Sequence, residues 1–366
     1  MNTQASSDYY DIGAVAGNRP PYIAKPGEFI FAAAFPEHVH IHGQCQGLLA
    51  AGAELKWIYD PDPRKMALFA AKYPQARAAR SFDEILADPV VRLVAAAGVP
   101  SEHGPIGCRT MEAGKDYFTD KAAFTTVEQW TQARAVVAAT GRKYLVYFAE
   151  RLESPCVFFA GELVGRGAIG RVIQILNLAP HRLNKSTRPA WFFEKAKSGG
   201  ILCDLGSHQF EQFLFFSGAK QATVVRAVVG NYANQDHPEF EDFGEASSLA
   251  ENSASHYARV DWFTPAGLRT WGDGRTFVLG TKGYIELRKY IDLGHEATGD
   301  HLYLVDERGE HAFDLEGKIP SRFYGDFILD CQHRTEKSIR QEHIFKTAEL
   351  CLNAQASAKT IAWEKM

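Results

Sequence analysis

Short apolar runs alternate with longer segments of helical composition over residues 29–150. The run Phe29–Phe35 contains no polar residue, which is typical of a strand buried on both faces of a parallel sheet. Further runs predict strands at Glu54–Tyr59, Arg92–Gly98, Tyr117–Lys121 and Lys143–Ala149. Helices are predicted between them, over His40–Ala51 and after capping residues at Asp62, Ser81, Ser101 and Thr126. This alternation predicts βαβ units and a doubly wound parallel α/β sheet.

The pattern changes after about residue 150, where strand-like runs follow one another with little helix between them. Strands are predicted at Arg171–Leu178, Thr223–Tyr232, Ser253–Phe263, Arg269–Leu279, Tyr284–Arg288 and His301–Val305. Helices are predicted at Pro155–Val164, Ile201–Phe216, Phe323–Gln332 and His343–Lys359. Consecutive strands favour an α+β domain with a large, open, mostly antiparallel sheet. We therefore expect an irregular arm at 1–28, a parallel α/β domain at 29–150 and an α+β domain at 151–366.

Composition and charge indicate which kinds of molecule this protein binds and in which compartment it folds. The formal net charge is -4, which gives no electrostatic reason to expect nucleic acid or an anionic membrane surface. The six cysteines form no C-x-x-C pair, a pattern that favours free thiols in a reducing compartment. No apolar run is long enough for a signal peptide or a membrane span. The expectation is a cytoplasmic protein that acts on a small molecule.

The first strand-to-helix turn is where a parallel sheet would hold a dinucleotide. The glycine fingerprint G-x-G-x-x-G is absent there, since the chain reads Ala33-Ala-Phe-Pro-Glu-His-Val-His-Ile-His-Gly43. Asp60 closes the second strand, where a carboxylate would accept hydrogen bonds from the ribose hydroxyls of NAD and repel the extra phosphate of NADP. The alternative interpretation of Asp60 is an ordinary turn residue.

Histidines 38, 40 and 42 raise the question of a metal site. On a strand, alternate residues share a face and can ligate one ion. These residues enter a helix, however, where a spacing of two points side chains apart. The sequence therefore predicts no metal, and leaves open a histidine near the helix N-terminus that contacts a pyrophosphate or solvated surface histidines.

Two further segments carry candidate chemistry. Lys121 closes a strand at the ligand edge of the sheet, as a solvated end or as a donor to a substrate oxygen. Asp204 and His208 are four residues apart, so they share one face of an otherwise apolar helix. Such polar groups must find partners or face a cleft. The alternative is a satisfied pair within the core.

Taken together, ordered motifs resemble the Gfo/Idh/MocA oxidoreductases, the family of glucose–fructose oxidoreductase and inositol dehydrogenase. The resemblance extends from about residue 29 to the C-terminus. Val99-Pro-Ser-Glu-His103 resembles T-P-N-x-x-H, and Ala113-Gly-Lys-Asp-Tyr-Phe-Thr-Asp-Lys121 resembles A-G-K-H-V-x-x-E-K-P. Gly167-Ala-Ile-Gly-Arg-Val172 is similar to G-x-I-G, and Gly280-Thr-Lys-Gly-Tyr-Ile-Glu286 to the G-T-x-G strand entry. Ser198-Gly-Gly-Ile-Leu-Cys-Asp-Leu-Gly-Ser-His208 is similar to G-G-G-x-x-x-D-x-G-x-H.

The resemblance implies a Rossmann domain, bound NAD or NADP, and a sheet domain that forms homodimers or homotetramers. It also implies that Lys121, Asp204 and His208 are catalytic, with Lys121 on the reacting oxygen and His208 as general base. Candidate cofactor residues are Phe35, Pro36, His38, His40, Ile41, Asp60, Val99, Pro100, His103, Asp120 and Lys121. Candidate substrate residues are Glu150, Arg151, His181, Arg188 and Trp191. This chain departs from the family pattern at the lost glycines and at Ala122, which replaces the proline after the lysine and puts the lysine's position in doubt.

These features predict an NAD-dependent dehydrogenase that oxidises a secondary alcohol of a sugar, glycoside or polyol. Two alternatives stay open. One is a glycosidase that uses bound NAD for a transient oxidation. The other is a cofactor-binding sensor without catalysis. The missing glycine fingerprint favours this alternative, whereas the presence of the lysine, aspartate and histidine together argues against it.

Overall fold

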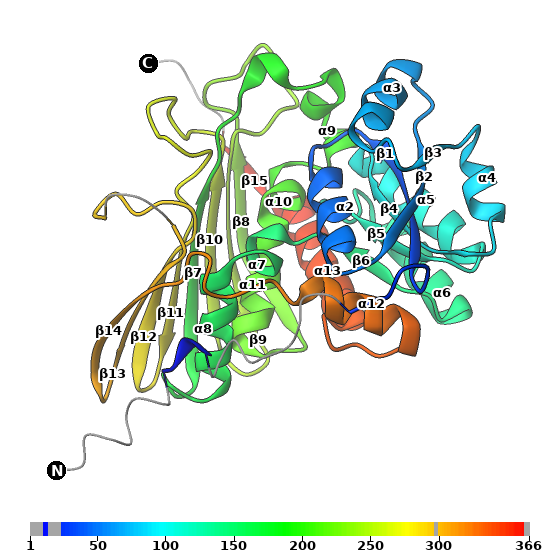
Figure 1. The fold of residues 1–366 in the computed structure, drawn as a ribbon. Coiled ribbons are helices and arrows are strands. Elements are labelled where there is room, and N and C mark those ends of the chain that lie inside the picture. The colour runs from blue at the N-terminus through cyan, green and yellow to red at the C-terminus, as the bar shows by residue number, and fades with distance from the viewer. Residues whose placement is uncertain (1–9, 14–22, 296–298, 362–366) are drawn as a thin grey trace.

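The structure, a computed structural model, describes residues 10–13, 23–295 and 299–361. A parallel sheet with its helices forms one side of the molecule, and a large second sheet forms the other (Figure 1). Most of the arm predicted at 1–28 lies outside the described residues; of its described part, the Tyr10 hydroxyl hydrogen-bonds to Asp306 in the second sheet. Among the described helices, none has both the length and the apolar character needed to cross a membrane.

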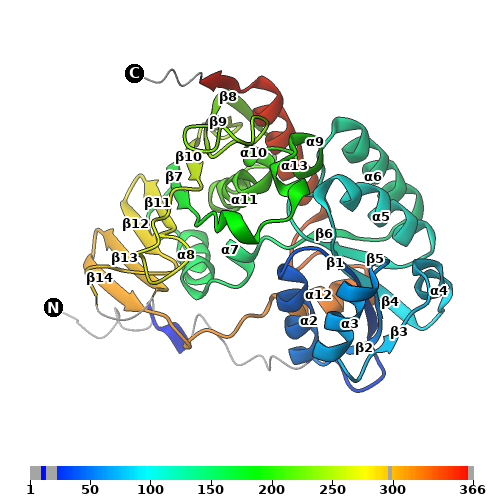
Figure 2. The same cartoon turned by 90° about the horizontal axis from the view of Figure 1, so that it is seen from above.

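The first domain is the predicted doubly wound sheet. Its strands are β1 (Ile30–Pro36), β2 (Glu54–Tyr59), β3 (Arg77–Ala78), β4 (Val91–Ala97), β5 (Asp116–Thr119) and β6 (Tyr144–Val146). They pair in parallel in the order β3-β2-β1-β4-β5-β6. The order reverses between β1 and β4, which is where such sheets hold ligands. Figure 2 shows α2 (His40–Ala50), α3 (Pro63–Lys72), α4 (Phe82–Ala87), α5 (Pro100–Glu112) and α6 (Val127–Thr140) around it.

Local capping explains where most of these helices begin. Asp62, Ser81 and Thr126 each accept a hydrogen bond from a backbone N–H in the first turn of the following helix, as predicted. The prediction that Ser101 caps α5 is wrong. That helix begins at Pro100 with Val99 as its cap residue. Proline suits the first helical position because its missing N–H has no intrahelical partner there.

The second domain contains one nine-stranded sheet in the order β14-β13-β12-β11-β7-β10-β9-β8-β15. Its strands are β7 (Val172–Pro180), β8 (Ala222–Gly230), β9 (Phe243–Ala250), β10 (Ser255–Asp261), β11 (Arg275–Gly280), β12 (Gly283–Arg288), β13 (His301–Asp306), β14 (Gly309–Asp314) and β15 (Lys359–Ile361). Most pairs are antiparallel, while β7 runs parallel to β10 and β8 parallel to β15. The predicted open, mostly antiparallel sheet is confirmed.

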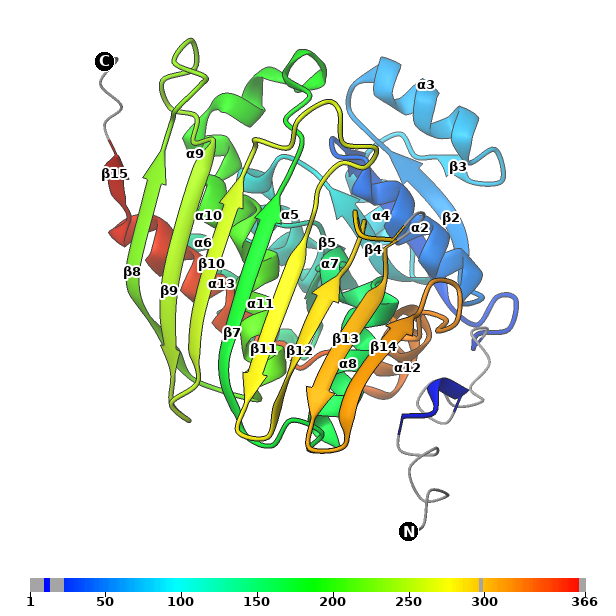
Figure 3. The ribbon, with the colours of Figure 1, turned by 90° about the vertical axis from the view of Figure 1, so that its left-hand side faces the viewer.

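Helices cover one face of this sheet and separate it from the first domain (Figure 1). They are α7 (Ala149–Leu152), α8 (Pro155–Gly165), α10 (Ile201–Asp204), α11 (Gly206–Ser217) and α13 (Gln341–Ser357). Two short 3₁₀ turns, Lys185–Thr187 and Ala190–Phe193, and α9 (Lys195–Ser198) connect β7 to α10. Figure 3 views the opposite face, where no helix of the described chain lies in front of the strands.

The chain returns to the first domain after the sheet. Helix α12 (Phe323–His333) packs on α2, and Arg334 just after it forms an ion pair with Asp116 of β5. At the helix crossing, Gly47 lies against the ring of Tyr324 so closely that an added Cβ would overlap the ring atoms. Tyr324 is fixed there by hydrogen bonds from its hydroxyl to Glu153 and to the Gly43 carbonyl.

We expect Gly47→Ala to destabilise the protein by about 1–3 kcal/mol, because Tyr324 has no room to move aside. Helix propensity alone would act in the opposite direction, by about 1 kcal/mol. Gly165→Ala is the matched control, since that glycine ends α8 and an added Cβ there meets nothing within 4 Å. Thermal unfolding followed by circular dichroism measures both. A Gly47→Ala protein that unfolds at or above the wild-type temperature would show that the crossing is looser than described.

Candidate active site

A cavity of about 680 Å³ lies between the two domains. The first domain supplies His38, His40 and Lys121 to its wall. The second supplies a larger set of mixed polar and aromatic residues, among them Glu150, His181, Arg188, His208, Trp262, Trp271, Lys289 and Tyr290. Polar groups set among aromatic walls are typical of sites for small molecules.

Lys121 and Asp204 join the two domains at this cavity. Lys121 follows β5 and Asp204 ends α10, and the lysine ammonium donates to the Asp204 carboxylate as a buried ion pair. Each residue is only 8% exposed. Burial raises the pKa of Asp204, but the charge and hydrogen bond of Lys121 outweigh it and hold that pKa below its usual value. The loss of the family proline does not remove Lys121 from the site; the Lys121–Ala122 peptide bond is cis.

His208 also lies in the cavity wall, on the first turn of α11. Its side chain is buried, and its Nδ1 atom has no hydrogen-bond partner in the described chain. Burial lowers the pKa of His208 to about 4, because an imidazolium there would lose its hydration; the nearby Glu150 carboxylate acts in the opposite direction, while Lys121, His40 and His181 lower the pKa further. The imidazole is therefore neutral near pH 7.

Glu150 brings a negative charge to the inner end of the cavity. Its Oε2 atom accepts hydrogen bonds from Lys289 and, at 2.9 Å, from Gln209 Nε2. Its Oε1 atom has no hydrogen-bond partner in the described chain and lies 3.8 Å from Nε2 of His181. Burial raises the pKa of Glu150, but the charge of Lys289 and the neighbouring histidines lower it to about 2. Glu150 is thus an ionised acceptor with one free oxygen.

Aromatic rings surround the predicted substrate residues His181 and Arg188. The His181 ring lies 4.5 Å from that of Trp271, and the Arg188 guanidinium lies 4.6 Å from the Phe192 ring and 5.1 Å from the Trp262 ring. Burial lowers the pKa of Arg188, although Asp204 opposes this. The cavity therefore presents flat apolar walls beside a half-buried cation.

Two predicted substrate residues lie elsewhere. Arg151 does not line this cavity: its guanidinium binds Glu211, packs over Phe215, and faces a separate cavity of about 220 Å³. That prediction is wrong because α7 turns successive side chains to different sides, so Glu150 and Arg151 diverge. Trp191 lines a smaller cavity that shares His38 and Lys121 with the large one, and its indole nitrogen lies 3.4 Å from Glu37 Oε2.

The turn after β1 follows a path that normally needs glycine. Phe35 has φ +54°, in the left-handed region, and its ring packs edge-on against Tyr59 and Phe82 at 5.6 and 5.0 Å between centroids. Pro36 removes one backbone donor from the turn. Glu37 adds a carboxylate, which Lys65 neutralises. The end of β1 and the turn after it therefore carry bulkier side chains where the fingerprint has glycines.

The other predicted cofactor residues divide into two groups. Asp60, Val99 and Pro100 lie just beyond the carboxyl ends of β2 and β4, where a dinucleotide would pass. Ile41 and His103 do not face that edge. The Ile41 side chain is completely buried in the core, and its N–H bonds to the His38 carbonyl. His103 is buried between the two turns, with Nδ1 2.7 Å from the Ala122 carbonyl and Nε2 2.9 Å from the Gly98 carbonyl, and the neutral ring donates to one of them.

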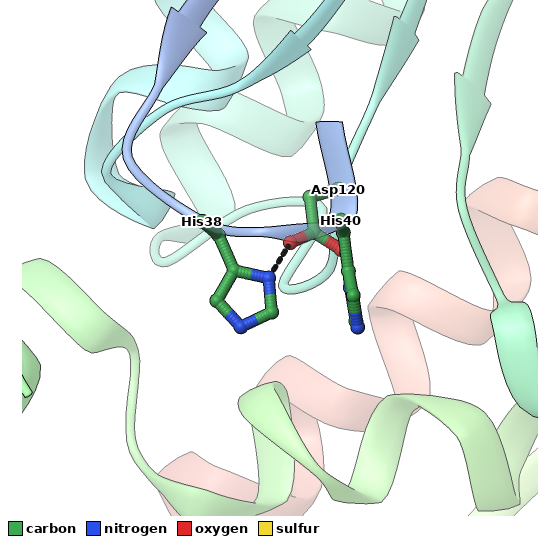
Figure 4. A group of neighbouring side chains, drawn as sticks. All are labelled: His38, His40 and Asp120. Carbon is green, nitrogen blue, oxygen red and sulfur yellow. Dashed lines mark hydrogen bonds and ion pairs between the residues drawn. The ribbon is translucent and has the colours of Figure 1, made fainter. Parts of the chain in front are cut away.

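His38 and His40 converge on Asp120 (Figure 4), contrary to the prediction that the three histidines point apart. The Nδ1 atom of each lies 2.8 Å from a different oxygen of Asp120. The prediction is wrong because α2 begins at His40, which leaves His38 on the preceding turn. His42 does point away, with Nδ1 3.1 Å from the Tyr73 hydroxyl.

The residues at the carboxyl edge of the parallel sheet fit a nicotinamide dinucleotide. The N-terminus of α2 has no acidic side chain in its first turn, so its backbone groups suit an anion. Asp60 stands where a ribose acceptor is needed and has one oxygen engaged, by the Asp62 N–H at 2.7 Å. A small cavity lined by Pro100, Lys121 and Asp204 adjoins the large cavity. The nicotinamide ring would meet the substrate where the two cavities join.

Sequence reasoning missed the cavity residues that lie next to the ends of strands in the second sheet. They are Trp262 after β10, Trp271 before β11, and Lys289 and Tyr290 after β12. The available signal was position, since each lies just outside a strand at the sheet end that faces the first domain. Lys289 directly follows an alternating strand, and this position could have indicated a lysine at the edge of the sheet.

Comparisons with known proteins agree with this architecture. Residues 32–148 match the family described as "Oxidoreductase family, NAD-binding Rossmann fold", and residues 159–286 match the "GFO/IDH/MocA C-terminal domain". The chain is 47% identical to a crystallised protein from Erwinia carotovora atroseptica described as a proposed oxidoreductase, over 91% of this chain and 100% of that one, with a TM-score of 0.89. It is 24% identical to scyllo-inositol 2-dehydrogenase (NAD(+)) of Bacillus subtilis, over 78% of each.

A levoglucosan dehydrogenase in complex with NADH and levoglucosan has the same fold, with a TM-score of 0.76 at 17% identity, covering 90% of this chain and 97% of that one. A dinucleotide-type domain that faces an open sheet domain across a polar cavity defines a two-domain oxidoreductase. This chain belongs to the GFO/IDH/MocA oxidoreductase family, as its ordered motifs indicate.

Proposed function

We propose that the protein is an NAD-dependent dehydrogenase that oxidises a secondary alcohol of a sugar, glycoside or polyol. The observation that carries the proposal is that Lys121 and His208 line one cavity between the domains, while Asp204, in the wall of the adjoining smaller cavity, binds the Lys121 ammonium. The family membership supports an oxidoreductase that acts on CH–OH groups. The aromatic walls at Trp262 and Trp271 suit the apolar face of a sugar ring.

The proposed roles follow from charge and burial. Bound NAD supplies the hydride acceptor. His208 takes the hydroxyl proton, because it is neutral and lines the cavity. Lys121 stabilises negative charge on the substrate oxygen as it develops. Asp204 holds the lysine ammonium in place, and the free oxygen of Glu150 orients a substrate hydroxyl.

The choice of NAD over NADP rests on Asp60, since a carboxylate there repels a 2′-phosphate. We expect Asp60→Asn to raise the ratio of kcat/KM with NADP to kcat/KM with NAD by about tenfold, equivalent to about 1.4 kcal/mol. Asp62→Asn is the matched control, because it removes a nearby acidic charge and keeps a capping side chain for α3. Steady-state assays with both cofactors measure the ratio. An unchanged ratio in Asp60→Asn would place cofactor selection elsewhere.

Screening polyols, aldoses and glycosides with NAD, by absorbance of NADH, tests the reaction itself. Oxidation of at least one polyhydroxylated substrate is the expected result. Cleavage of a chromogenic glycoside without added NAD would favour the NAD-dependent glycosidase. Tight NAD binding without turnover of any substrate tested would favour a sensor.

We also propose that the protein acts as a homodimer or homotetramer in the cytoplasm. The uncovered face of the nine-stranded sheet supports self-association (Figure 3). Leu279 and Tyr284 are cross-strand partners with 43% and 46% exposure, and Leu249 is exposed on β9 of that sheet. Apolar side chains gathered on one face are typical of protein interfaces. Light scattering measures the mass in solution.

A further inference from the structure

The cluster of His38, His40 and Asp120 has the composition of a metal site. The three side chains come from the turn after β1, the first residue of α2 and the turn after β5, so they meet where the parallel sheet opens to the cavity (Figure 4). Each residue offers one candidate ligand atom, a ring nitrogen or a carboxylate oxygen, and these three atoms all lie within 4.8 Å of one another. Two histidines and one carboxylate on adjacent turns form a three-ligand set with open positions.

The two histidines of the cluster make different contacts with Asp120. His40 Nδ1 hydrogen-bonds to Asp120 Oδ1 at 2.8 Å, and the Lys121 backbone N–H donates to the same oxygen at 2.7 Å. His38 Nδ1 lies 2.8 Å from Asp120 Oδ2, and no hydrogen-bond partner is assigned to this buried nitrogen in the described chain. A ring nitrogen and a carboxylate oxygen therefore lie close together at the opening of the cavity.

One cation between the His38 nitrogen and the Asp120 oxygen would bind to both atoms. Zinc forms bonds of about 2.0–2.2 Å to histidine nitrogen and carboxylate oxygen, so one ion can span two atoms 2.8 Å apart. The angle at the ion is then close to 90°, as in the two-histidine, one-carboxylate triads of six-coordinate metals.

We propose that His38, His40 and Asp120 bind one divalent first-row transition-metal ion, contrary to the expectation from the sequence. Both histidines line the large cavity, so the open coordination positions face the same space as Lys121 and His208. A water molecule or a substrate oxygen can complete the coordination there. The site thereby adds a charge at the junction of the cofactor groove and the substrate cavity.

The experiment uses the full-length chain without a histidine tag, stripped of metal by a chelator and dialysed. Isothermal titration with Zn²⁺ and visible absorption with Co²⁺ measure binding without any need for activity. We expect one equivalent to bind, and we expect His38→Gln, His40→Gln and Asp120→Asn each to weaken binding at least about tenfold. His42→Gln is the matched control, because that ring faces Tyr73 outside the cluster and should bind the metal as the wild type does.

Titration heat and a Co²⁺ spectrum that are absent in the wild type would overturn the proposal and leave the cluster as a hydrogen-bonded group. Equal binding by the wild type and all three cluster variants would also overturn it, by assigning the metal to other side chains. X-ray absorption of the wild-type Co²⁺ complex gives a readout that needs no variant. Fewer than two imidazoles in the coordination shell would contradict the site even where a substituted protein fails to fold. A failed dehydrogenase assay leaves these outcomes unchanged.

Discussion

Replacing Lys121 by Met should lower kcat by about 10²–10³-fold with the substrate that the screen identifies, because the substrate oxygen loses its positive donor in the transition state. The methionine keeps the length of the side chain and removes its charge. NADH binding, followed by protein fluorescence, should stay close to that of the wild type, since the proposed role of Lys121 is on substrate. Steady-state kinetics with saturating NAD measure the effect.

The change at Lys121 also leaves the buried Asp204 carboxylate without its partner. The double variant Lys121→Met with Asp204→Asn separates the two effects, because it removes both charges of the pair. It should be as inactive as the single variant if the lysine acts on substrate. Lys72→Met is the control for a lysine on the exposed surface of α3. Wild-type turnover by Lys121→Met would remove the lysine from the mechanism.

The alternation of apolar runs was enough to predict every strand of the first domain except the two-residue β3, because buried parallel strands are apolar on both faces and their helices carry caps. In the second domain, sequence missed β9, β14 and β15. The β9 sequence Phe243-Gly-Glu-Ala-Ser-Ser-Leu-Ala250 has small and polar residues at most positions, so its pairing with β8 and β10 supplies what its own pattern lacks. The edge strand β14 buries none of its side chains deeply, so it has little apolar signal.

The candidate site divides along similar lines. The Asp204 and His208 pair was visible because charged and polar residues on an apolar helix need partners or a cleft. The convergence of His38 and His40 on Asp120 was not, since it depends on where α2 begins and on how the turn after β5 approaches it. The misplacement of Arg151 has the same origin. A residue next to a cavity in sequence can face away from it when the backbone turns into a helix, as it does at Ala149.

Replacing His208 by Asn should lower kcat by about 10²–10⁴-fold, the usual contribution of a positioned general base. Asparagine keeps a polar group near Glu150 but cannot take up a proton at these pH values. The pH profile adds a test that a structural role would not pass. Because burial lowers the pKa of His208 to about 4, the base form persists as the pH falls, and kcat/KM should decline only below about pH 5.

An unburied histidine would instead produce that decline near its reference pKa of about 6.5. The pH at which kcat/KM declines depends on Glu150, which raises the pKa of His208, and on Lys121, His40 and His181, which lower it. Glu150→Gln should therefore move this acid limb of the pH profile to lower pH, and the limb should be absent in His208→Asn. An acid limb that survives unchanged in His208→Asn would assign proton transfer to another group at the cavity, with His181 the first to test because it lies 3.8 Å from Glu150.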